Sequence, residues 1–513
     1  MKKSMKSAAM LLISVLATST LVTACSSGSS NQPNASGAPE LSGSAKPDLK
    51  PVELTMVFPV ASEQKDLKAV QEKINKITKE KINATVKLVQ ITKGAWAQQT
   101  TLMLSGNEKM DLIVSGRGTY EQQVAKGNYL ALDDYIAKYG QGAQKALDDL
   151  DPAYLKATRI NGKSYGITSI RDLANDFGIS MRKDLVDKYK IDTKAIRSLD
   201  DLDAVFKVIK ENEPDVIPVT KFANSILGST PFSTGMMDPL GDGFGVLTAH
   251  DNGMKVVNWV ETPEYAKLLD TTRRWYLAGY VAKDAATSTE IWQNLMKAGK
   301  AFSTFHHMSP FSEAANSLSV GKDLVEVRLL PAVATNSHIT AYMWSIPRNA
   351  QDPERSMMLL NLMYTDKDLV NLLDWGIEGQ HYVKKSDNVI DFPQGVNASN
   401  SGYYPYQNWL FGNMFLSYLF NGEDPDRNKK LAEFIKNSKK SKALGFIYNP
   451  ESVKTEIAAL TNVSNQYALA LETGTVDPAK VLPEYIKQMK AAGIDKVIAE
   501  KQKQLDAWAA ANK

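Results

Sequence analysis

Residues 52–59 read VELTMVFP, a short run rich in β-branched and apolar side chains that is typical of a strand. The chain then alternates between helix and strand patterns. The expected elements are a helix over 63–81, a strand over 84–90, a helix over 96–105 and a strand, DLIVS, over 111–115. This β-α-β-α-β order predicts a parallel sheet with right-handed crossovers.

A second α/β unit is expected after the Asn161-Gly162 turn signal. Its predicted strands are 164–169, 179–182, 216–220, 300–305 and 325–331, and a further strand is expected at 340–346. Its predicted helices are 183–189, 199–211, 263–278 and 289–298, followed by 353–364 and one or two helices in the last 35 residues. A doubly wound chain that revisits each half predicts two lobes, with a ligand cleft beyond the carboxyl ends of the strands.

The first 24 residues have the pattern of an export signal. Lys2, Lys3 and Lys6 precede an apolar stretch over 8–22 that is too short for a stop-transfer helix. Residues 22–25 read VTAC, an apolar residue and two small residues before Cys25, which is the single cysteine of the chain. This pattern is typical of a lipobox, so we expect cleavage before Cys25 and attachment of a diacylglycerol to its thiol. The alternative is an ordinary signal peptide with a chance cysteine.

Residues 25–50 are dominated by Ser, Gly, Pro, Ala and Asn and have almost no large apolar side chain. Such a segment buries too little surface to order itself, so a flexible, lipidated tether is expected there. With one cysteine, the chain has no disulfides and no thiolate metal site, and its stability must come from its core.

The charge composition gives no sign of a nucleic-acid partner. The chain has 60 basic and 57 acidic residues, and three of the basic ones lie in the expected signal peptide. The mature chain is therefore formally neutral, which leaves no excess of positive charge for nucleic acid or an anionic lipid surface. No later stretch is long and apolar enough for a membrane span, so contact with the membrane is expected through the lipid anchor alone.

Four short motifs in order along the chain resemble one family. They are NGKSYGI at 161–167, MRKDL at 181–185, GIEGQHY at 376–382 and WLFGN at 409–413. With the lipobox and the tether, they are similar to the extracellular solute-binding proteins (family 1) of sugar ABC transporters, in the branch that contains LplA and YtcQ. The resemblance implies a monomeric, two-lobed α/β receptor of the type II periplasmic-binding-protein fold. Each lobe would be a mixed sheet flanked by helices, with hinge crossovers between the lobes.

The resemblance also implies a domain division and a function. The expected parts are a signal peptide (1–24), a tether (25–50), a first lobe (51–168 with about 345–376), and a second lobe with the C-terminal helices (about 169–344 with about 377–513). The expected function is capture of an oligosaccharide at the outer face of the cell membrane, with delivery to the transmembrane subunits of an ABC permease. Relatives in this branch suggest plant-derived or uronate-containing sugars.

Two departures from the family pattern are visible. Some relatives carry a calcium loop in the second lobe, whereas the matching stretch here, KENEPDV at 210–216, has neither the spacing nor the glycine. Six or so oxygen ligands on a turning loop are needed to bind Ca²⁺, so no metal site and no cofactor are expected. Thr168 stands where the family motif has proline, which weakens the hinge assignment at that point.

Sugar recognition needs aromatic rings against the apolar faces of the sugar and planar polar groups for paired hydrogen bonds. Residues of these types at expected strand ends and turns are the candidate ligand contacts. They are Arg117, Arg171, Asp172, His306, Trp344, Trp375, Glu378, His381, Tyr382 and Trp409. For each aromatic residue the alternative is core packing, for Glu378 it is a surface charge, and for Arg171 and Asp172 it is a mutual salt bridge.

Two other functions stay open at this stage. A receptor of the same fold could bind a peptide or a polyamine, and a polyamine would favour a more acidic cleft. A secreted carbohydrate-active enzyme on the same anchor would need two carboxylates across the sugar. The chain has no H-E-x-x-H and no Walker A motif, and Gly241-Asp242-Gly243-Phe244-Gly245 has neither the spacing nor the position of a dinucleotide loop. The sequence therefore predicts a binding protein and not an enzyme.

Overall fold

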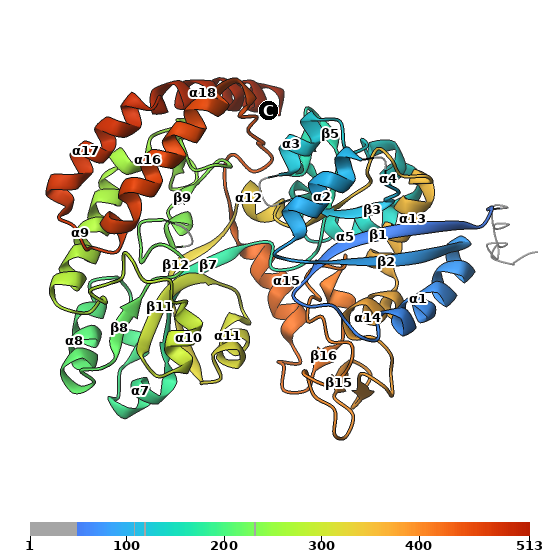
Figure 1. The fold of residues 1–513 in the computed structure, drawn as a ribbon, viewed down its shortest axis with the longest axis horizontal. Helices are drawn as coiled ribbons and strands as arrows, with labels where there is room; N and C mark the ends of the chain where they lie inside the picture. Colours follow the sequence, from blue (N-terminus) through green and yellow to red (C-terminus); the bar gives the residue numbers. More distant parts are fainter. Residues whose placement is uncertain (1–48, 107, 117–118, 230–231, 513) are drawn as a thin grey trace, which may run out of the picture. The chain divides into compact units, whose positions relative to one another are not determined.

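The first three strands join two later short ones in a five-stranded mixed sheet of the order β2-β1-β3-β13-β6 (Figure 1). The computed structural model describes residues 49–106, 108–116, 119–229 and 232–512. β1 pairs in parallel with both β2 and β3, whereas β13 is antiparallel to β3 and β6. The expected β-α-β-α-β start is confirmed. The strands and the first two helices are β1 (Val52–Val60), α1 (Leu67–Ile82), β2 (Ala84–Thr92), α2 (Trp96–Ser105), β3 (Leu112–Ser115), β6 (Ile167–Thr168) and β13 (Met343–Ser345).

Helix α1 shows why this start folds as it does. Its buried residues recur every four positions, at Val70, Ile74, Thr78 and Ile82, so one face packs on the sheet and the Lys/Glu face is left to solvent. The helix ends at Asn83, which has a φ of 46° and donates its backbone N–H to the carbonyl of Lys79. An asparagine tolerates this left-handed conformation, and it turns the chain directly into β2.

The second sheet also has five strands, in the order β17-β12-β7-β11-β8. β7 is central and runs antiparallel to both β11 and β12, while β8 pairs in parallel with β11. All eight residues of β7 are buried, as expected for a strand covered on both faces. The strands of this sheet are β7 (Asn175–Arg182), β8 (Ile217–Thr220), β11 (Ala301–Met308), β12 (Leu324–Ala334) and β17 (Lys439–Lys440). The two sheets with their helices confirm the expected two-lobed α/β fold.

Each sheet carries its own hydrophobic core, and the chain passes between the two cores three times. The crossings lie between Ala174 and Phe177, between Val333 and Ala334, and between Ile435 and Ala443. They fall at the start of β7, the end of β12 and β17, and these strands are neighbours in one sheet. The three connections are therefore side by side and hydrogen-bonded to one another, which is the construction of a hinge.

The third crossing differs from the sequence-based division, which put residues 377–513 in the second lobe. Tyr403, Leu410, Phe411 and Leu431 are buried in the core of the first sheet, and the chain joins the second core only from Ala443. These residues of 403–435 therefore pack with the first lobe, whereas the sequence-based division put them in the second. The aromatic side chains of this segment pack against the first-lobe helices, and its helical and turn patterns gave no indication of which core they would choose.

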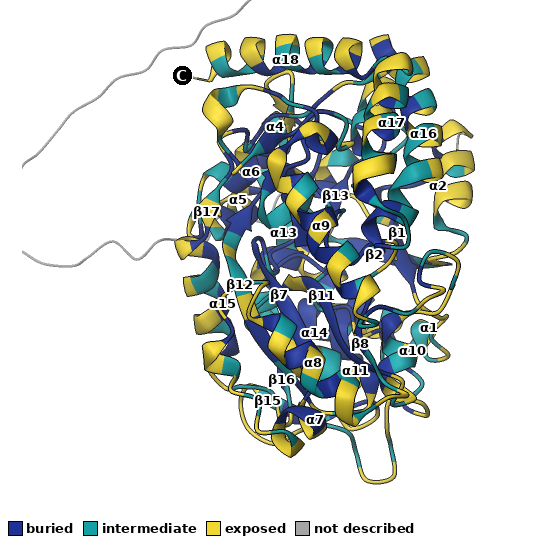
Figure 2. Ribbon diagram, turned by 90° about the vertical axis from the view of Figure 1, so that its left-hand side faces the viewer, coloured by how far each residue is buried: buried dark blue, intermediate teal, exposed yellow. Residues whose placement is uncertain are grey.

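The helices α16, α17 and α18 pack on the second core, on the same side as α9 (Figure 1). Colouring by burial shows buried strands inside, covered by helices whose outer faces are exposed (Figure 2). The helices after α2 are α3 (Tyr120–Ala125), α4 (Asp133–Tyr139), α5 (Gln141–Asp148), α6 (Ala153–Lys156), α7 (Lys183–Lys188), α8 (Leu202–Asn212), α9 (Pro263–Leu277), α10 (Trp292–Lys297), α11 (Ser312–Val320), α12 (Asn336–Ile339), α13 (Pro353–Thr365), α14 (Lys367–Trp375), α15 (Arg427–Asn437), α16 (Lys454–Glu472), α17 (Pro478–Ala491) and α18 (Ile494–Ala511). The short strands are β4 (Arg159–Ile160), β5 (Lys163–Ser164), β9 (Met237–Asp238), β10 (Leu247–Thr248), β14 (Val383–Lys384), β15 (Val389–Asp391) and β16 (Leu419–Phe420), and the 3₁₀ turn η2 spans Phe232–Gly235.

Candidate functional site

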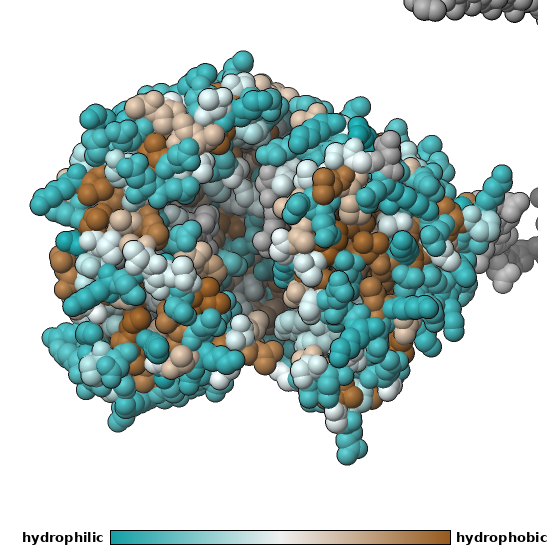
Figure 3. Space-filling view, in the orientation of Figure 1, coloured by the Kyte–Doolittle hydropathy of each residue, from teal (hydrophilic) through white to brown (hydrophobic). Residues whose placement is uncertain are grey.

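A cavity of about 1610 Å³ lies where the chain crosses between the two cores. Its walls come from the start of β7, from the end of β12 with α12, and from several loops of both lobes. The space-filling view shows the corresponding hollow in the middle of the molecule (Figure 3). Pockets for drug-sized ligands are about 300–1,000 Å³, so this one has room for a larger, extended ligand.

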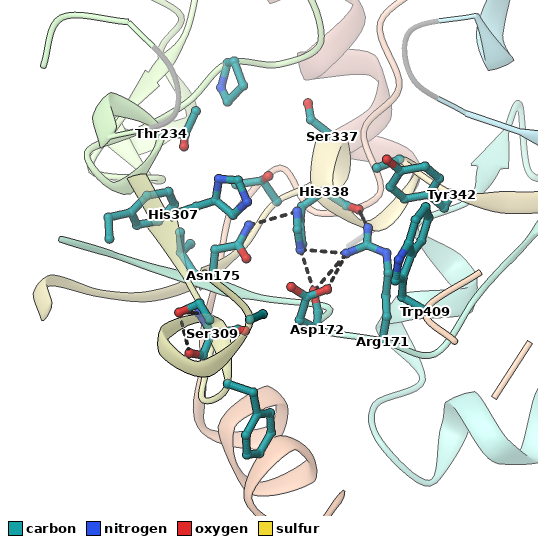
Figure 4. Close-up of a pocket in the computed structure, with 18 of the residues that line it drawn as sticks. Arg171, Asp172, Asn175, Thr234, His307, Ser309, Ser337, His338, Tyr342 and Trp409 are labelled. Carbon is teal, nitrogen blue, oxygen red and sulfur yellow. Dashed lines mark hydrogen bonds and ion pairs between the residues drawn. The ribbon is translucent and has the colours of Figure 1, made fainter. Parts of the chain in front are cut away.

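Arg171 is the central cation of the cavity, although only 3% of its surface is exposed. Its Nη1 donates to the carbonyl and to Oδ1 of Asp172, at 3.0 and 2.9 Å, and its Nη2 donates to the carbonyl of His338 (Figure 4). The planar guanidinium thus ties the segment before β7 to helix α12. The mutual contact with Asp172, which was the alternative to a ligand contact, is present, and both side chains also line the cavity.

His338 completes this cluster as a neutral imidazole. Its Nε2 lies 2.5 Å from the carbonyl of Asp172 and 3.0 Å from Nη1 of Arg171. Its Nδ1 lies 3.0 Å from Nδ2 of Asn175. Desolvation, with the charge of Arg171 in addition, lowers the pKa of His338 to about 3. The ring of His338 is therefore neutral at neutral pH.

Aromatic rings supply the apolar part of the cavity wall. The rings of Tyr342 and Trp409 lie 4.5 Å apart at 57°, and the guanidinium of Arg171 lies 5.4 Å from the Tyr342 ring (Figure 4). A second pair, Tyr404 and Tyr406, is stacked at 5.4 Å and 25° and also lines the cavity. Tyr406 is 42% exposed, which is unusual for a large aromatic side chain.

The charge of the cavity is predominantly acidic. Among the described lining residues there is no lysine, and the two arginines, Arg171 and Arg427, are each paired with a carboxylate, Asp172 and Glu423. The acidic lining residues are Asp172, Asp242, Glu313, Glu423, Asp424 and Glu472. Four of these carboxylates are paired with a cation, Asp172 with Arg171, Asp242 with Lys501, Glu423 with Arg427 and Asp424 with Lys430. Among the described lining residues, no basic side chain is therefore left unpaired for an anionic ligand.

Trp409, Arg171 and Asp172 are the predicted site residues that line the cavity. His306 does not. It is buried on the other face of β11, where Nε2 lies 2.6 Å from Oγ of Ser180, and its neighbour His307 faces the cavity instead. Adjacent strand residues point to opposite faces, and the sequence did not say which of the two faces was the cavity.

Trp344, another expected ligand contact, does not line the cavity either. It is fully buried in the first-lobe core, and its Nε1 donates to the carbonyl of Leu410 at 2.8 Å. This hydrogen bond satisfies the single polar atom of the indole, so the side chain has no surface left for a ligand.

The glycine-broken turn at 376–382 was expected to face the cleft, and it does not line the cavity. Gly376 has a φ of 80°, and a Cβ added there would lie 2.3 Å from Nδ1 of His381, so this turn is closely packed. Trp375 and Tyr382 are buried in a small aromatic cluster with Tyr418, and His381 accepts from the backbone N–H of Ile377. Glu378 is on the surface, paired with Lys384 at 3.0 Å. Arg117 and Cys25 lie outside the described residues.

Several residues that line the cavity were not among the candidates chosen from the sequence. They are His307, His338, Tyr342 and the loop around Asp242. The position of His338 and Tyr342 just after the crossing into the first core was a usable signal, because hinge segments border the cleft. Within the described ranges, no group of three or more His, Cys, Asp and Glu side chains is placed to hold a metal ion. None of the described helices is long and apolar enough to cross a membrane.

Comparison with known proteins identifies the family to which this architecture belongs. Residues 61–370 match the family described as bacterial extracellular solute-binding protein, and residues 442–510 match a domain of unknown function, DUF3502. The chain belongs to the bacterial extracellular solute-binding proteins. It is 30% identical over 515 residues to a carbohydrate ABC transporter substrate-binding protein of Streptococcus pneumoniae serotype 4, with 98% of each chain covered.

Solved structures support the same assignment. The structure is similar to the N-glycan transport solute-binding protein NgtS of Streptococcus pneumoniae, with a TM-score of 0.79, 28% identity, and coverage of 90% of this chain and 100% of the other. The complex of NgtS with Man5GlcNAc matches with a TM-score of 0.69 and the same identity and coverage. A polygalacturonan/rhamnogalacturonan-binding protein, YtcQ of Bacillus subtilis, is 24% identical over 277 residues, which cover 52% of this chain and 53% of YtcQ.

The family and these relatives are substrate-binding components of transporters and not enzymes, as the sequence predicted. The chain does contain the spacing Gly162-x-Ser164-x-Gly166, which serine hydrolases share. There the serine sits exposed on a turn between a strand and a helix. Here Ser164 is fully buried in the β4–β5 hairpin and does not line the cavity.

Proposed function

We propose that this solute-binding protein is the lipid-anchored receptor of a carbohydrate ABC transporter and that it captures a neutral oligosaccharide in the cavity. The observation that carries the proposal is the combination, in one large cavity at the hinge, of the Tyr342–Trp409 ring pair with the fixed polar groups around Arg171. Rings cover the apolar faces of pyranoses, and planar polar groups pair with neighbouring hydroxyls.

The acidic lining, in which no described basic side chain is unpaired, argues for a neutral sugar over the uronates suggested by part of the family. A uronate needs an uncommitted cation to receive its carboxylate, and Arg171 already bonds Asp172 and His338. Arg427 is buried against Glu423. The relative with the greater coverage is a transporter component for N-glycans, whereas the polygalacturonan-binding relative matches about half of the chain.

The same acidic lining favours a second candidate, a cationic ligand such as a polyamine. Five of the six acidic lining residues come from three loops and from α11, so a linear cation could reach several of them. The aromatic pairs would also receive a cation over their faces. The carbohydrate-transport relatives favour the sugar, and spermidine is therefore the discriminating competitor.

Capture would proceed by closure of the two lobes about the three neighbouring crossings, and the closed form would be presented to the permease. A ligand favours closure only by the difference in its affinity for the two states. Two structures of one relative match this chain with different TM-scores at equal identity, which fits a body that changes shape. Cys25 would hold the monomer at the outer face of the cell membrane, as its lipobox suggests.

Isothermal titration of the purified mature chain tests the sugar, with Man5GlcNAc, Man1GlcNAc, trigalacturonate and spermidine as ligands. We expect binding of Man5GlcNAc with no hydrolysis, and no binding of trigalacturonate. Preferential binding of trigalacturonate or of spermidine would overturn the neutral-sugar assignment, and turnover at an enzyme-like rate would overturn the receptor. For the anchor, Cys25→Ser in the producing cell should release the protein into the medium.

A further inference from the structure

The glycine-rich loop that the sequence left without a role forms part of the cavity wall. Pro239, Gly241, Asp242, Gly243 and Phe244 all line the cavity. Gly241, Gly243 and Gly245 have φ values of 99°, 81° and 93°, a region that other L-residues rarely adopt. The glycines therefore permit a backbone path that other residues would strain, and contacts from elsewhere must hold the loop in that conformation.

A lysine from the C-terminal helix α18 holds this loop from behind. Lys501 is fully buried, and its Nζ donates to Oδ1 of Asp242 at 2.6 Å and to the carbonyls of Phe244 and Gly245 at 2.8 and 3.1 Å. The Nζ also lies 4.6 Å from the ring centroid of Tyr448. All the donor capacity of the ammonium is thus used on one loop.

Such a buried ion pair is a poor device for stability. Burial lowers the pKa of Lys501, which shows that the desolvation of the ammonium is not fully offset by Asp242. Buried pairs can often be replaced by apolar residues of similar volume without loss of stability, so stability alone does not account for Lys501. The pair instead fixes the position of a carboxylate that faces the cavity.

Asp242 is suited to receive a ligand. Its Oδ1 accepts from Lys501 and, at 2.9 Å, from the backbone N–H of Phe244, which fixes the plane of the carboxylate. Among the described residues, Oδ2 has no hydrogen-bond partner, and 22% of the side chain is exposed. A fixed carboxylate with one unused oxygen is an acceptor for sugar hydroxyls, and a charged acceptor forms the stronger kind of hydrogen bond.

We propose that the loop 239–245 is a sugar-recognition loop, in which Asp242 accepts hydrogen bonds from the hydroxyls of the oligosaccharide and Lys501 is the positioning residue. This assigns a task to the segment at 442–510, whose family description gives none: it holds a recognition loop in place from the rear. The inference rests on the proposed function, since it presumes an oligosaccharide in the cavity.

The first test compares Asp242→Asn with Asp251→Asn by titration with Man5GlcNAc. Both aspartates accept from the backbone N–H two residues on, and Asp251 does not line the cavity. We expect Asp242→Asn to weaken binding about tenfold or more and Asp251→Asn to leave it unchanged. Unchanged binding by Asp242→Asn overturns the inference alone. Failure of the wild-type protein to bind any oligosaccharide removes the proposed function and this inference with it.

The second test separates positioning from stability. Lys501→Met should weaken binding of Man5GlcNAc about tenfold. The control Lys496→Met, at an exposed lysine of the same helix α18 that pairs with Glu456 of α16, should not. The double variant Lys501→Met/Asp242→Asn removes both charges, so its melting temperature should recover toward that of the wild type while its affinity stays low. Recovery of affinity together with the melting temperature would show that neither Asp242 nor Lys501 acts on the ligand, and it would overturn the inference. A single Lys501→Met variant that binds as tightly as the wild type would overturn the role of Lys501 alone.

Discussion

The rings of Trp409 and Tyr342 lie 4.5 Å apart and join two segments that are far apart in the sequence, the stretch before η5 (Met414–Leu416) and the turn between α12 and β13. The guanidinium of Arg171 lies 5.4 Å from the Tyr342 ring, and Nζ of Lys93 lies 6.0 Å from the Trp409 ring, so each ring has a cation near it. Both rings line the cavity. Trp409 is half-buried, which leaves part of its indole for a ligand. This arrangement gives the cavity an apolar surface of fixed orientation.

Trp409→Ala should therefore weaken oligosaccharide binding by about tenfold or more, about 1.4 kcal/mol, because the apolar face of a sugar loses its support. The matched control is Trp508→Ala, which removes another half-buried tryptophan that packs on Phe446 and does not line the cavity. Titration calorimetry with Man5GlcNAc measures both. Equal losses in the two variants would show that Trp409 acts through general stability and not through ligand contact.

Arg171→Lys keeps the positive charge and removes the planar fork. A lysine cannot reach the carbonyl and carboxylate of Asp172 and the carbonyl of His338 together, so buried acceptors lose their donors. We expect a loss of about 1–3 kcal/mol in the free energy of unfolding, measured with urea.

The control for this change is Arg274→Lys. Arg274 is almost half exposed and pairs with Asp200 and Asp203 on the surface, so its substitution should cost about 0.5 kcal/mol or less. If Arg171→Lys proves equally mild, the cluster around Arg171 does not hold the hinge side of the cavity in the way described.

The parts of the fold that local pattern decides were predictable. The four-residue spacing of buried side chains in α1 and the β-branched runs of β1 and β3 are local signals. The site residues were harder to predict. The candidates were chosen because they lie at expected strand ends and turns, and such positions do not say which side chains face the cavity. The pair at 306–307 shows why: the alternation of faces is local, but the pairing of β11 between β7 and β8 decides which face meets the cavity. Gly376 likewise lies at a real turn, but the side chain of His381 packs directly against it, so the turn has no open space for a ligand.

Acid should destabilise the protein through His338. Its pKa is about 3 in the folded state, lowered by desolvation and by the charges of Arg171 and His307 and opposed by Asp172. The unfolded chain binds a proton near the ordinary value of 6.5. The folded state therefore lags in proton uptake, and stability is lost as the pH falls from about 6.5 toward 3.

His338→Gln tests this, with urea unfolding at pH 7.5 and pH 5. The wild type should lose up to about 2 kcal/mol over this interval through His338, in addition to losses through other histidines. Those other losses, including the one expected from His306, whose pKa is lowered to about 4, are common to both proteins and cancel. The variant should show a smaller pH dependence, and an identical dependence would contradict the assigned pKa of His338.

Asp374 should make stability depend on pH in the opposite direction. It lies in α14 with 1% of its surface exposed, and burial raises its pKa to about 7, while Ser417 and Arg427 offset this only in part. Its folded-state pKa is above the unfolded value, so its contribution to stability is complete below about pH 3.8 and is lost as the pH rises through about 7.

At pH 8 the fold holds the buried carboxylate of Asp374, whose charge is poorly compensated. Asp374→Asn keeps the shape and removes that charge, so it should raise the free energy of unfolding at pH 8 by about 1–4 kcal/mol and flatten its fall between pH 5 and pH 8. The exposed Asp387→Asn should do neither, and a loss of stability at pH 8 in Asp374→Asn would mean that the carboxylate is well paired where it lies.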